Sequence, residues 1–310
     1  MIVVCGEALI DLVAEGDVLR PHLGGGPFNV AVALGHLDVP VGFCSRISSD
    51  QFGRQLRDRL HVSGVDLRYV LSGDEPTPLA IVQVGPGGEA EYGFYLEGTA
   101  DGQITPSRLP ALQGGVSVLH FGTLSLVTEP TASTFEGLMS REAGRRLIVL
   151  DPNVRPVVIG DHAGYVARFE SWLAAADVVK ISDADAAWLY PELDVDEVCQ
   201  RILERGACLV AATLGPAGAM ICSGSATASV PPVHVTVVDT VGAGDSFGAG
   251  VMRWLWERDA LTRAAIEALS LEDLQALATF ANSVAALVCS RAGADPPTID
   301  EVRAFAALAA

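Results

Sequence analysis

Short apolar runs alternate along the chain with longer segments in which apolar residues recur at helical spacing. This pattern is typical of an α/β fold, because parallel strands buried on both faces need long crossover connections, which are usually helices. We expect buried strands at residues 2–5, 41–45, 116–121, 147–151, 178–181, 208–213 and 218–222. We expect helices at residues 29–37, 52–61, 131–145, 165–174, 183–189, 195–204, 245–256 and 271–288. No repeat or Pro/Ser-rich linker interrupts the pattern, so residues 1–310 are predicted to form a single domain.

Two segments, at about residues 9–18 and 77–100, do not fit this alternation. In the second, residues 79–84 and 90–96 flank Gly85-Pro86-Gly87-Gly88, which is typical of a turn between antiparallel strands. Antiparallel strands inserted into a mostly parallel fold would form a small lid over one edge of the sheet. The alternative is a surface hairpin without a functional role. Because an exposed strand such as 79–84 can pair with a second copy, we expect a homodimer through the lid.

The chain carries 38 acidic and 20 basic residues, a formal net charge of −18. This charge repels a phosphate backbone and an anionic membrane surface, so we predict neither a nucleic-acid nor a membrane partner. A small phosphate ligand held by backbone N–H groups stays compatible with it. No run of 18 apolar residues is present, and the N-terminus lacks the basic region of a signal peptide. Six cysteines without a C-x-x-C pair are typical of reduced thiols, so we predict a cytoplasmic location.

The segment 239–250, with the sequence DTVGAGDSFGAG, is the most informative part of the chain about its possible reaction. It follows a β-like run at 234–238 and precedes a helical pattern. Gly242, Ala243 and Gly244 allow a sharp turn whose N–H groups point at one spot, at a helix N-terminus that favours an anion. Asp245 would stand beside that spot and accept a proton from a hydroxyl attacking a phosphoryl group. The alternative is that Asp245 only stabilises the first turn of the helix.

Two other phosphate-binding motifs fit less well. A P-loop is absent, because the only lysine, Lys180, follows no glycine loop. Gly242-x-Gly244-x-x-Phe247 is close to a dinucleotide fingerprint, but Phe247 occupies the third glycine position, where close helix–strand packing leaves no room for a side chain. An NAD-dependent oxidoreductase is thereby disfavoured. Its ribose-binding acid would have to be Glu267, in what reads as a later helix.

Three further segments have ligand-binding character. Asp11, together with Asn29 behind Gly24-Gly25-Gly26, combines a carboxylate, an amide and open backbone, which suits the hydroxyls of a polyol. The loop at 213–218 has glycines that let a nucleotide lie against the backbone. Arg155 follows a predicted strand, and at the carboxyl end of a sheet it would reach a substrate or a phosphate. The alternatives are a helix N-cap for Asn29, a plain turn for 213–218, and a surface Arg–Asp pair for Arg155.

Together these segments resemble the ribokinase-like (PfkB) family of carbohydrate kinases. Gly24-Gly25-x-x-x-Asn29, with Gly35, Gly42 and Asp50-x-x-Gly53, matches one signature, and Asp239-Thr240-x-Gly242-Ala243-Gly244-Asp245-x-Phe247 matches the other. Asp151-Pro152-Asn153 and the loop at 213–218 match in order and spacing, so the resemblance covers essentially the whole chain. It implies a Rossmann-like three-layer α/β/α fold with a small β-sheet lid, and ATP-dependent phosphorylation of a hydroxymethyl group. Closure of the lid would exclude water from the reaction.

The resemblance also implies roles for individual residues. Asp245 would be the catalytic base, and the anion hole would be formed by the N–H groups of Gly242, Ala243 and Gly244. The sugar would be bound by Asp11, Gly25 and Asn29, with Arg155 as a further contact. ATP would be bound by Lys180, Thr213, Gly215, Gly218 and Asn282. The cations would be Mg²⁺, through Asp185, and a monovalent ion such as K⁺, beside Asp239 and Val241.

Two positions depart from the family pattern. Ser182-Asp183-Ala184-Asp185 stands where the family has an Asn-x-x-Glu motif that helps to organise Mg²⁺ and phosphates, so Ser182 replaces a longer amide. Leu96 stands where several sugar and sugar-acid kinases have an arginine, and Glu97 follows it. A Glu97 side chain near the pocket would repel a carboxylate substrate, which disfavours 2-keto-3-deoxygluconate, although Arg155 would compensate.

The expected sugar is inferred only from two short sequence segments. Residues 151–155 and 179–183 are more similar to fructokinases than to ribokinases, so we expect fructose as the substrate. The alternatives within the family are a 2-keto-3-deoxygluconate kinase and a ribokinase or other nucleoside kinase. From a different class, the alternative is a non-catalytic sugar-binding regulator that keeps the fold.

Overall fold

The computed structural model describes residues 1–84, 90–224 and 226–309. Within these residues, one large sheet has nine strands in the order β13-β12-β11-β10-β9-β8-β1-β4-β5. Neighbouring strands from β11 to β5 run parallel, whereas β12 and β13 are added antiparallel at one edge. The strands are β1 (Ile2–Cys5), β4 (Val41–Ser48), β5 (Val70–Gly73), β8 (Val118–Gly122), β9 (Leu147–Asp151), β10 (Val178–Ser182), β11 (Leu209–Thr213), β12 (Ala219–Ser223) and β13 (Thr227–Val230).

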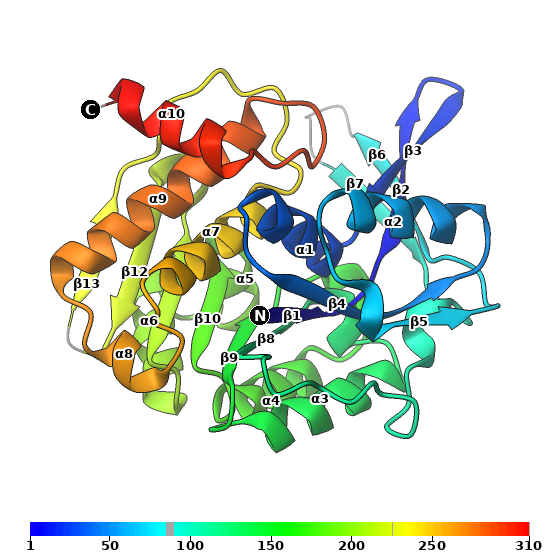
Figure 1. Cartoon of the computed structure of the whole chain (residues 1–310), viewed down its shortest axis with the longest axis horizontal. Coiled ribbons are helices and arrows are strands. Elements are labelled where there is room, and N and C mark those ends of the chain that lie inside the picture. The colour runs from blue at the N-terminus through cyan, green and yellow to red at the C-terminus, as the bar shows by residue number, and fades with distance from the viewer. Residues whose placement is uncertain (85–89, 225, 310) are drawn as a thin grey trace.

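Helices cover both faces of this sheet, as Figure 1 shows for α9 on one side and α3 and α4 on the other. Successive side chains of a strand point to opposite faces, so Leu147 and Val149 pack on one layer and Ile148 and Leu150 on the other. The first layer consists of α1 (Gly26–His36), α2 (Gln51–Val62), α7 (Ala243–Glu257), α8 (Arg263–Glu267), α9 (Leu271–Cys289) and α10 (Ile299–Ala309). The second layer consists of α3 (Thr131–Glu142), α4 (His162–Leu173), α5 (Asp183–Leu189) and α6 (Val195–Arg205). The predicted three-layer α/β/α architecture is therefore confirmed.

Short connections complete the described chain. They include five 3-10 helices, namely η1 (Leu67–Tyr69), η2 (Ala100–Gln103), η3 (Thr123–Leu126), η4 (Pro156–Val158) and η5 (Gly215–Ala217). Of the helices in the described ranges, none is long and apolar enough to cross a membrane.

A second, four-stranded sheet forms the predicted lid, in the order β3-β2-β6-β7. Its strands are β2 (Leu9–Glu15), β3 (Val18–Gly24), β6 (Leu79–Val84) and β7 (Ala90–Tyr95), and they lie to the upper right in Figure 1. The pairing of β6 with β7 confirms the predicted hairpin, whose turn at 85–88 lies outside the described residues. β6 is an interior strand between β2 and β7, so the expectation of a free edge at 79–84 was wrong. The edges of the lid are β3 and β7.

The β-like run at 234–238 was also a wrong prediction, because it forms no strand. Pro231 and Pro232 precede it and cannot donate ladder hydrogen bonds, so pairing with the sheet stops at the end of β13. The side chains of Val237 and Val238 are exposed, and the Val238 N–H donates to the Cys289 carbonyl at the end of α9. Apolar β-branched residues therefore occur here in an extended surface segment.

Among the strands and α-helices of the described residues, β3, β5, β13 and α10 were not predicted, whereas α8 contains Glu267, which was expected in a helix. β3 illustrates the reason, because most of its side chains face solvent and it contains Pro21. An exposed edge strand leaves no apolar run in the sequence. The predicted helix at 131–145 ends earlier, at Glu142, where Ala143 takes an extended conformation.

Candidate active site

A cavity of about 520 Å³ lies between the lid sheet and the carboxyl ends of β8, β9 and β10. The lid contributes Asp11, Tyr92 and Phe94 to its wall, and the large sheet and its helices contribute polar residues from several segments. The predicted site residues that line it are Asp11, Gly25, Asn29, Arg155, Lys180, Asp239, Val241, Gly242, Gly244 and Asp245. The fold thus brings together residues that are more than 230 positions apart in the sequence.

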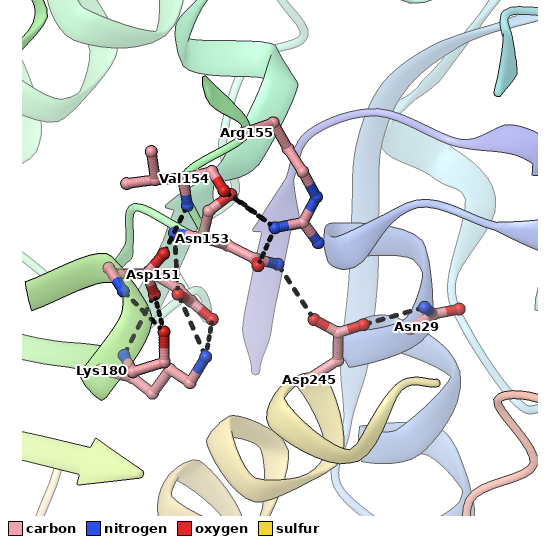
Figure 2. A network of polar contacts seen from close by, with 9 residues as sticks. Asn29, Asp151, Asn153, Val154, Arg155, Lys180 and Asp245 are labelled. Carbon is pink, nitrogen blue, oxygen red and sulfur yellow. Dashed lines mark hydrogen bonds and ion pairs between the residues drawn. The ribbon is translucent and has the colours of Figure 1, made fainter. Parts of the chain in front are cut away.

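The buried carboxylate of Asp245 is held by two amides. Asn29, in the first turn of α1, donates its Nδ2 to Asp245 Oδ2 at 2.8 Å, and Asn153 donates its Nδ2 to Oδ1 at 3.4 Å (Figure 2). Burial raises the pKa of Asp245 above its ordinary value, against the Asn29 hydrogen bond and the charges of Lys180 and Arg155, which lower it. Both oxygens are therefore oriented, and the group is a stronger base than an exposed aspartate.

The N-terminal turn of α7 presents unpaired N–H groups to the same cavity. Gly242 is the N-cap with a φ of 75°, a left-handed conformation that favours glycine, and a Cβ there would lie 2.7 Å from Ala294 Cβ. Within the described residues, no hydrogen bond is formed by the N–H groups of Gly242, Gly244 and Asp245. The Ala243 N–H instead donates to the Thr240 carbonyl at 3.2 Å. Together with the helix dipole, these groups make a site for an anion.

Arg155 acts on Asp245 through Asn153. Its Nη1 donates to Asn153 Oδ1 at 2.7 Å, which fixes the amide so that Nδ2 faces Asp245 (Figure 2). Asn153 follows β9 in a left-handed conformation, with a φ of 37°. Among the described residues Arg155 forms no ion pair, so the alternative of a surface Arg–Asp pair was wrong.

Asp11 faces the cavity from β2 of the lid. Its carboxylate accepts no hydrogen bond from any described residue and lies against Gly24, where a Cβ would be 2.0 Å from Oδ2. Burial raises the pKa of Asp11 to about 6, the charge of Arg155 opposes this shift, and Asp245 adds to it. A carboxylate without a partner among the described residues, on the wall of a cavity, is suited to accept hydrogen bonds from ligand hydroxyls.

Lys180 and Asp151 form a buried ion pair below α7. Lys180 Nζ lies 3.1 Å from Asp151 Oδ2 and 3.4 Å from Oδ1 (Figure 2). Burial disfavours the charged ammonium, but Asp151, then Asp185 and Asp245, outweigh that cost, so the pKa of Lys180 lies above its ordinary value. The residue is therefore a fixed positive charge in the wall of the cavity.

The other residues predicted to bind ATP lie outside this cavity. Thr213 ends β11 and pairs in register with Ser182 at the end of β10, which places it on the same carboxyl edge of the sheet. The Asn282 side chain donates to the Pro231 carbonyl at 3.2 Å. Gly218 packs against the neighbouring Val230 carbonyl, 2.2 Å from its Cβ position, so Gly218 and Asn282 converge on one segment. Gly215 lies in η5, between Thr213 and Gly218 in the sequence.

Asp185, the residue predicted for Mg²⁺, accepts hydrogen bonds from the protein itself. Asp185 Oδ1 accepts the Val154 N–H at 2.7 Å, and its Oδ2 accepts both the N–H and the hydroxyl of Ser182 in a capping box. Across the described ranges, no group of three or more His, Cys, Asp or Glu side chains could hold a metal ion. Ser182, where the family has an asparagine, is thus the N-cap of α5, and Asp185 completes that cap.

Asp239 and Val241, the residues predicted for the monovalent cation, lie at the same cavity. Asp239 Oδ1 accepts the Val241 N–H at 3.1 Å, and Oδ2 accepts the Gly293 N–H at 2.8 Å. These bonds tie the loop before α7 to the loop before α10.

Glu97 does not contribute to the cavity, contrary to expectation. Its side chain is exposed and is not part of the lining, whereas Leu96 packs against a small apolar cluster of Leu9, Ala80 and Leu124. The argument that Glu97 repels a carboxylate substrate was therefore wrong, because the chain turns at Gly98 with that side chain pointing to solvent.

Comparison with known proteins decides the class of enzyme. Residues 1–301 match the family described as pfkB family carbohydrate kinase. The chain belongs to the pfkB family of carbohydrate kinases. This confirms the resemblance seen in the motifs and makes the chain an ATP-dependent sugar kinase, not an NAD-dependent oxidoreductase.

Relatives and structures in this family agree with that class. A fructokinase from Rhizobium leguminosarum bv. trifolii is 41% identical over 280 residues, which cover 89% of this chain and 86% of the relative. The ATP-bound fructokinase of Xylella fastidiosa has a TM-score of 0.90 at 27% identity, over 99% of this chain and 98% of that chain. A double mutant of the Vibrio cholerae O395 fructokinase, with fructose, ADP and a potassium ion, has a TM-score of 0.85 at 26% identity, over 98% and 97%.

Asn153, Glu7 and Tyr92 also line the cavity, and the sequence analysis did not name them as site residues. Asn153 could have been found, because a polar residue directly after a buried parallel strand lies at the carboxyl edge of the sheet. Glu7 had the same signal, since it stands two positions after β1, whereas Tyr92 had none, because its place at the cavity depends on how the lid strands pair.

Proposed function

We propose that this kinase transfers the γ-phosphoryl group of ATP to a hydroxymethyl group of fructose, with Asp245 as the general base. The observation that carries the proposal is the Asp245 carboxylate, fixed by Asn29 and Asn153 beside the unpaired N–H groups of Gly242 and Gly244. A base next to an anion site is what in-line phosphoryl transfer needs. The fructokinase that is 41% identical supports fructose as the acceptor.

In the proposed reaction, the sugar hydroxyl attacks the γ-phosphorus of ATP, and its proton goes to Asp245. The bond between the γ-phosphorus and the β–γ bridging oxygen breaks, and ADP leaves with that electron pair. The N–H groups of Gly242 and Gly244 stabilise the charge on the transferring group, since their dipoles are already oriented before the reaction. Mg²⁺ would enter with the ATP phosphates and neutralise part of their charge; Asp185 is not proposed as its direct ligand.

The sugar is bound from both sides of the cavity. Asp11, on the lid, accepts hydrogen bonds from hydroxyls, and Asn29 keeps its Oδ1 and its second N–H for the same purpose while it orients Asp245. Gly25, the N-cap of α1, lets the sugar approach the backbone. Arg155 also lines the cavity and completes the set, and it can face a carboxylate, so 2-keto-3-deoxygluconate stays in the substrate test.

ATP is proposed to lie along the carboxyl edge of β10 and β11. Its nucleoside would contact Thr213, Gly215 and Gly218, with Asn282 near the base, and its phosphates would extend to Lys180 and the first turn of α7. A potassium ion beside Asp239 and Val241 is proposed as an activator, supported by the potassium-bound Vibrio enzyme. The six free cysteines support a cytoplasmic location.

The experiment that tests this function is an ADP-release assay with ATP and Mg²⁺ against fructose, ribose, 2-keto-3-deoxygluconate and adenosine. Turnover that is highest with fructose is expected. Turnover with another member of the panel would overturn the choice of sugar. If none of the four compounds gives ADP release but a sugar raises the melting temperature, the result would support the non-catalytic regulator instead.

We also propose that two copies associate through their lids. Val18, Leu19 and Tyr95 are exposed apolar side chains on the edge strands β3 and β7, and these edges have unpaired backbone groups. One chain has a mass of 32.3 kDa, and light scattering should give twice that mass. A monomer mass at working concentration would contradict the dimer.

A further inference from the structure

The segment 152–155, which follows β9, contains one residue in a sparsely populated backbone conformation. Asn153 has a φ of 37°, in the left-handed region that residues other than glycine adopt uncommonly. Such a conformation persists only where the surrounding structure fixes it, and it is most frequent at functional sites. The side chain of Asn153 lies between Arg155 and Asp245 (Figure 2). The contacts that fix this backbone therefore affect how the Asp245 carboxylate is held.

Two buried carboxylates hold the peptide groups on either side of Asn153. Asp151 Oδ1 accepts the Asn153 N–H at 3.1 Å, and Asp185 Oδ1 accepts the Val154 N–H at 2.7 Å. The first N–H belongs to the peptide group before Asn153 and the second to the peptide group after it, so the two bonds fix the backbone on both sides. Because both carboxylates are buried, water competes little for these donors.

Asp185 reaches this segment from the neighbouring strand. β9 and β10 pair in parallel, so their carboxyl ends lie side by side. Ser182 ends β10 and caps α5, and Asp185 Oδ2 accepts the Ser182 N–H at 3.0 Å and the Ser182 hydroxyl at 2.6 Å. The cap thereby leaves Oδ1 for the Val154 N–H. Neither Asp185 nor Val154 belongs to the described residues that line the cavity, so any effect of Asp185 on the reaction is indirect.

We propose that Asp185 is a positioning residue, which holds Asn153 through the Val154 N–H in the conformation that directs the Asn153 amide to Asp245. The inference rests on the proposed function, in which Asp245 is the general base. In this role Asp185 contacts neither the sugar nor ATP, and it takes up no proton. It acts on the geometry of the base alone.

A purely structural role as part of a helix cap is the first alternative, and the chain offers a matched control for it. α9 begins with the same capping box, in which Asp273 Oδ2 accepts the Ser270 N–H at 3.0 Å and the Ser270 hydroxyl at 2.7 Å. Among the described residues, Asp273 accepts no hydrogen bond from another segment. Asp273→Ala therefore removes a cap alone, whereas Asp185→Ala removes a cap and the bond to Val154. A structural role predicts that both variants lose melting temperature and keep the wild-type kcat.

The proposal predicts that kcat of Asp185→Ala lies about 10–100-fold below wild type, with KM for ATP and for the sugar nearly unchanged. Asp273→Ala should keep the wild-type kcat. In a chain that already carries Asn153→Ala, Asp185→Ala should lower kcat little further, because both residues act through one contact. A full additional loss in that double variant would show an effect that bypasses Asn153, such as that of the Asp185 charge, and would overturn the proposal. A wild-type kcat for Asp185→Ala would overturn it as well.

The second alternative is the role that the resemblance implies, in which Asp185 helps to organise Mg²⁺. In that case Asp185→Ala should raise the free Mg²⁺ concentration for half-maximal turnover about 10–100-fold. The positioning role predicts a concentration close to that of wild type. A rise of the larger size would overturn the proposal.

A crystal structure of a variant gives a measurement that needs no turnover. Asp185→Asn keeps the size of the side chain and serves if Asp185→Ala does not fold. Its single acceptor oxygen would face the two Ser182 donors, so its Nδ2 would face the Val154 N–H and could not accept from it. We expect Asn153 to leave the left-handed region and its Nδ2 to move away from Asp245. An unchanged Asn153 would overturn the proposal. A displaced Asn153, in an enzyme whose wild type phosphorylates no sugar, would instead contradict the proposed function and support the positioning of Asn153 by Asp185.

Discussion

Asn29 donates a 2.8 Å hydrogen bond to Asp245, and so joins the first turns of two helices that are 216 residues apart. The bond fixes the carboxylate at the start of α7 from the start of α1, the helix that follows the lid strand β3. The lid and the Asp245 base are therefore connected through a segment of a few residues, from Gly24 to Asn29.

Removal of the Asn29 amide should shift the pH dependence of the reaction. The bond from Asn29 lowers the pKa of Asp245, so Asn29→Ala raises that pKa further. The base works when it is deprotonated, so the acidic limb of kcat/KM should move to higher pH. Asn153→Ala, which removes the longer 3.4 Å bond, is the matched control and should move the limb less. A larger shift of the acidic limb in Asn153→Ala than in Asn29→Ala would contradict the stronger effect expected of the Asn29 hydrogen bond.

Sugar binding should weaken in acid because of Asp11. Burial raises the pKa of Asp11 to about 6, so the carboxylate is charged above that pH and becomes protonated below it. We expect KM for the sugar to rise as the pH falls through 6, whereas Asp11→Asn should show a high KM that does not change over the same range. A variant with the pH dependence of the wild type would exclude Asp11 from sugar binding.

Glu7 should make the fold less stable at alkaline pH. Its side chain is fully buried, Oε2 accepts the Ser125 N–H, and Oε1 has no partner among the described residues. Burial raises its pKa from 4.5 to about 8, so folding favours the protonated form and stability falls as the pH rises from 4.5 through 8. Glu7→Gln is neutral at every pH and should melt at least about 2–4 °C above wild type at pH 8.5. The difference should nearly vanish at pH 5.

Gly242, the N-cap of α7, and Gly248, inside that helix, should respond differently to replacement by alanine. A side chain at Gly242 should cost about 1–3 kcal/mol of folding stability, because φ is 75° there and an added Cβ would contact Ala294. The added side chain should also distort the turn that presents the N–H groups. At Gly248, within α7, an added Cβ meets nothing within 4 Å. Gly242→Ala should therefore lower both melting temperature and kcat, whereas Gly248→Ala should keep both or raise the melting temperature. Equal effects would show that the turn has no special role.

Some strands of the fold and one turn of the site were predictable from the sequence for physical reasons. Buried parallel strands such as β1 and β9 are continuous apolar runs, and the turn before α7 needs glycine at Gly242, so both leave a local pattern. The exposed edge strand β3 leaves none. The pairing of Asn29 with Asp245 depends on tertiary geometry, because the two residues are 216 positions apart. The exposure of Glu97 follows from the turn at Gly98, whose position the sequence analysis did not predict.

The most direct test of the account is kcat for Asp245→Asn with fructose and ATP. The substitution keeps the shape of the side chain and removes its ability to take a proton, while Asn29 and Asn153 still surround it. We expect kcat to fall about 10²–10⁴-fold, with the melting temperature and the affinity for ATP close to those of wild type. A kcat within a few-fold of wild type would contradict the role of Asp245 as the base, and with it the central claim.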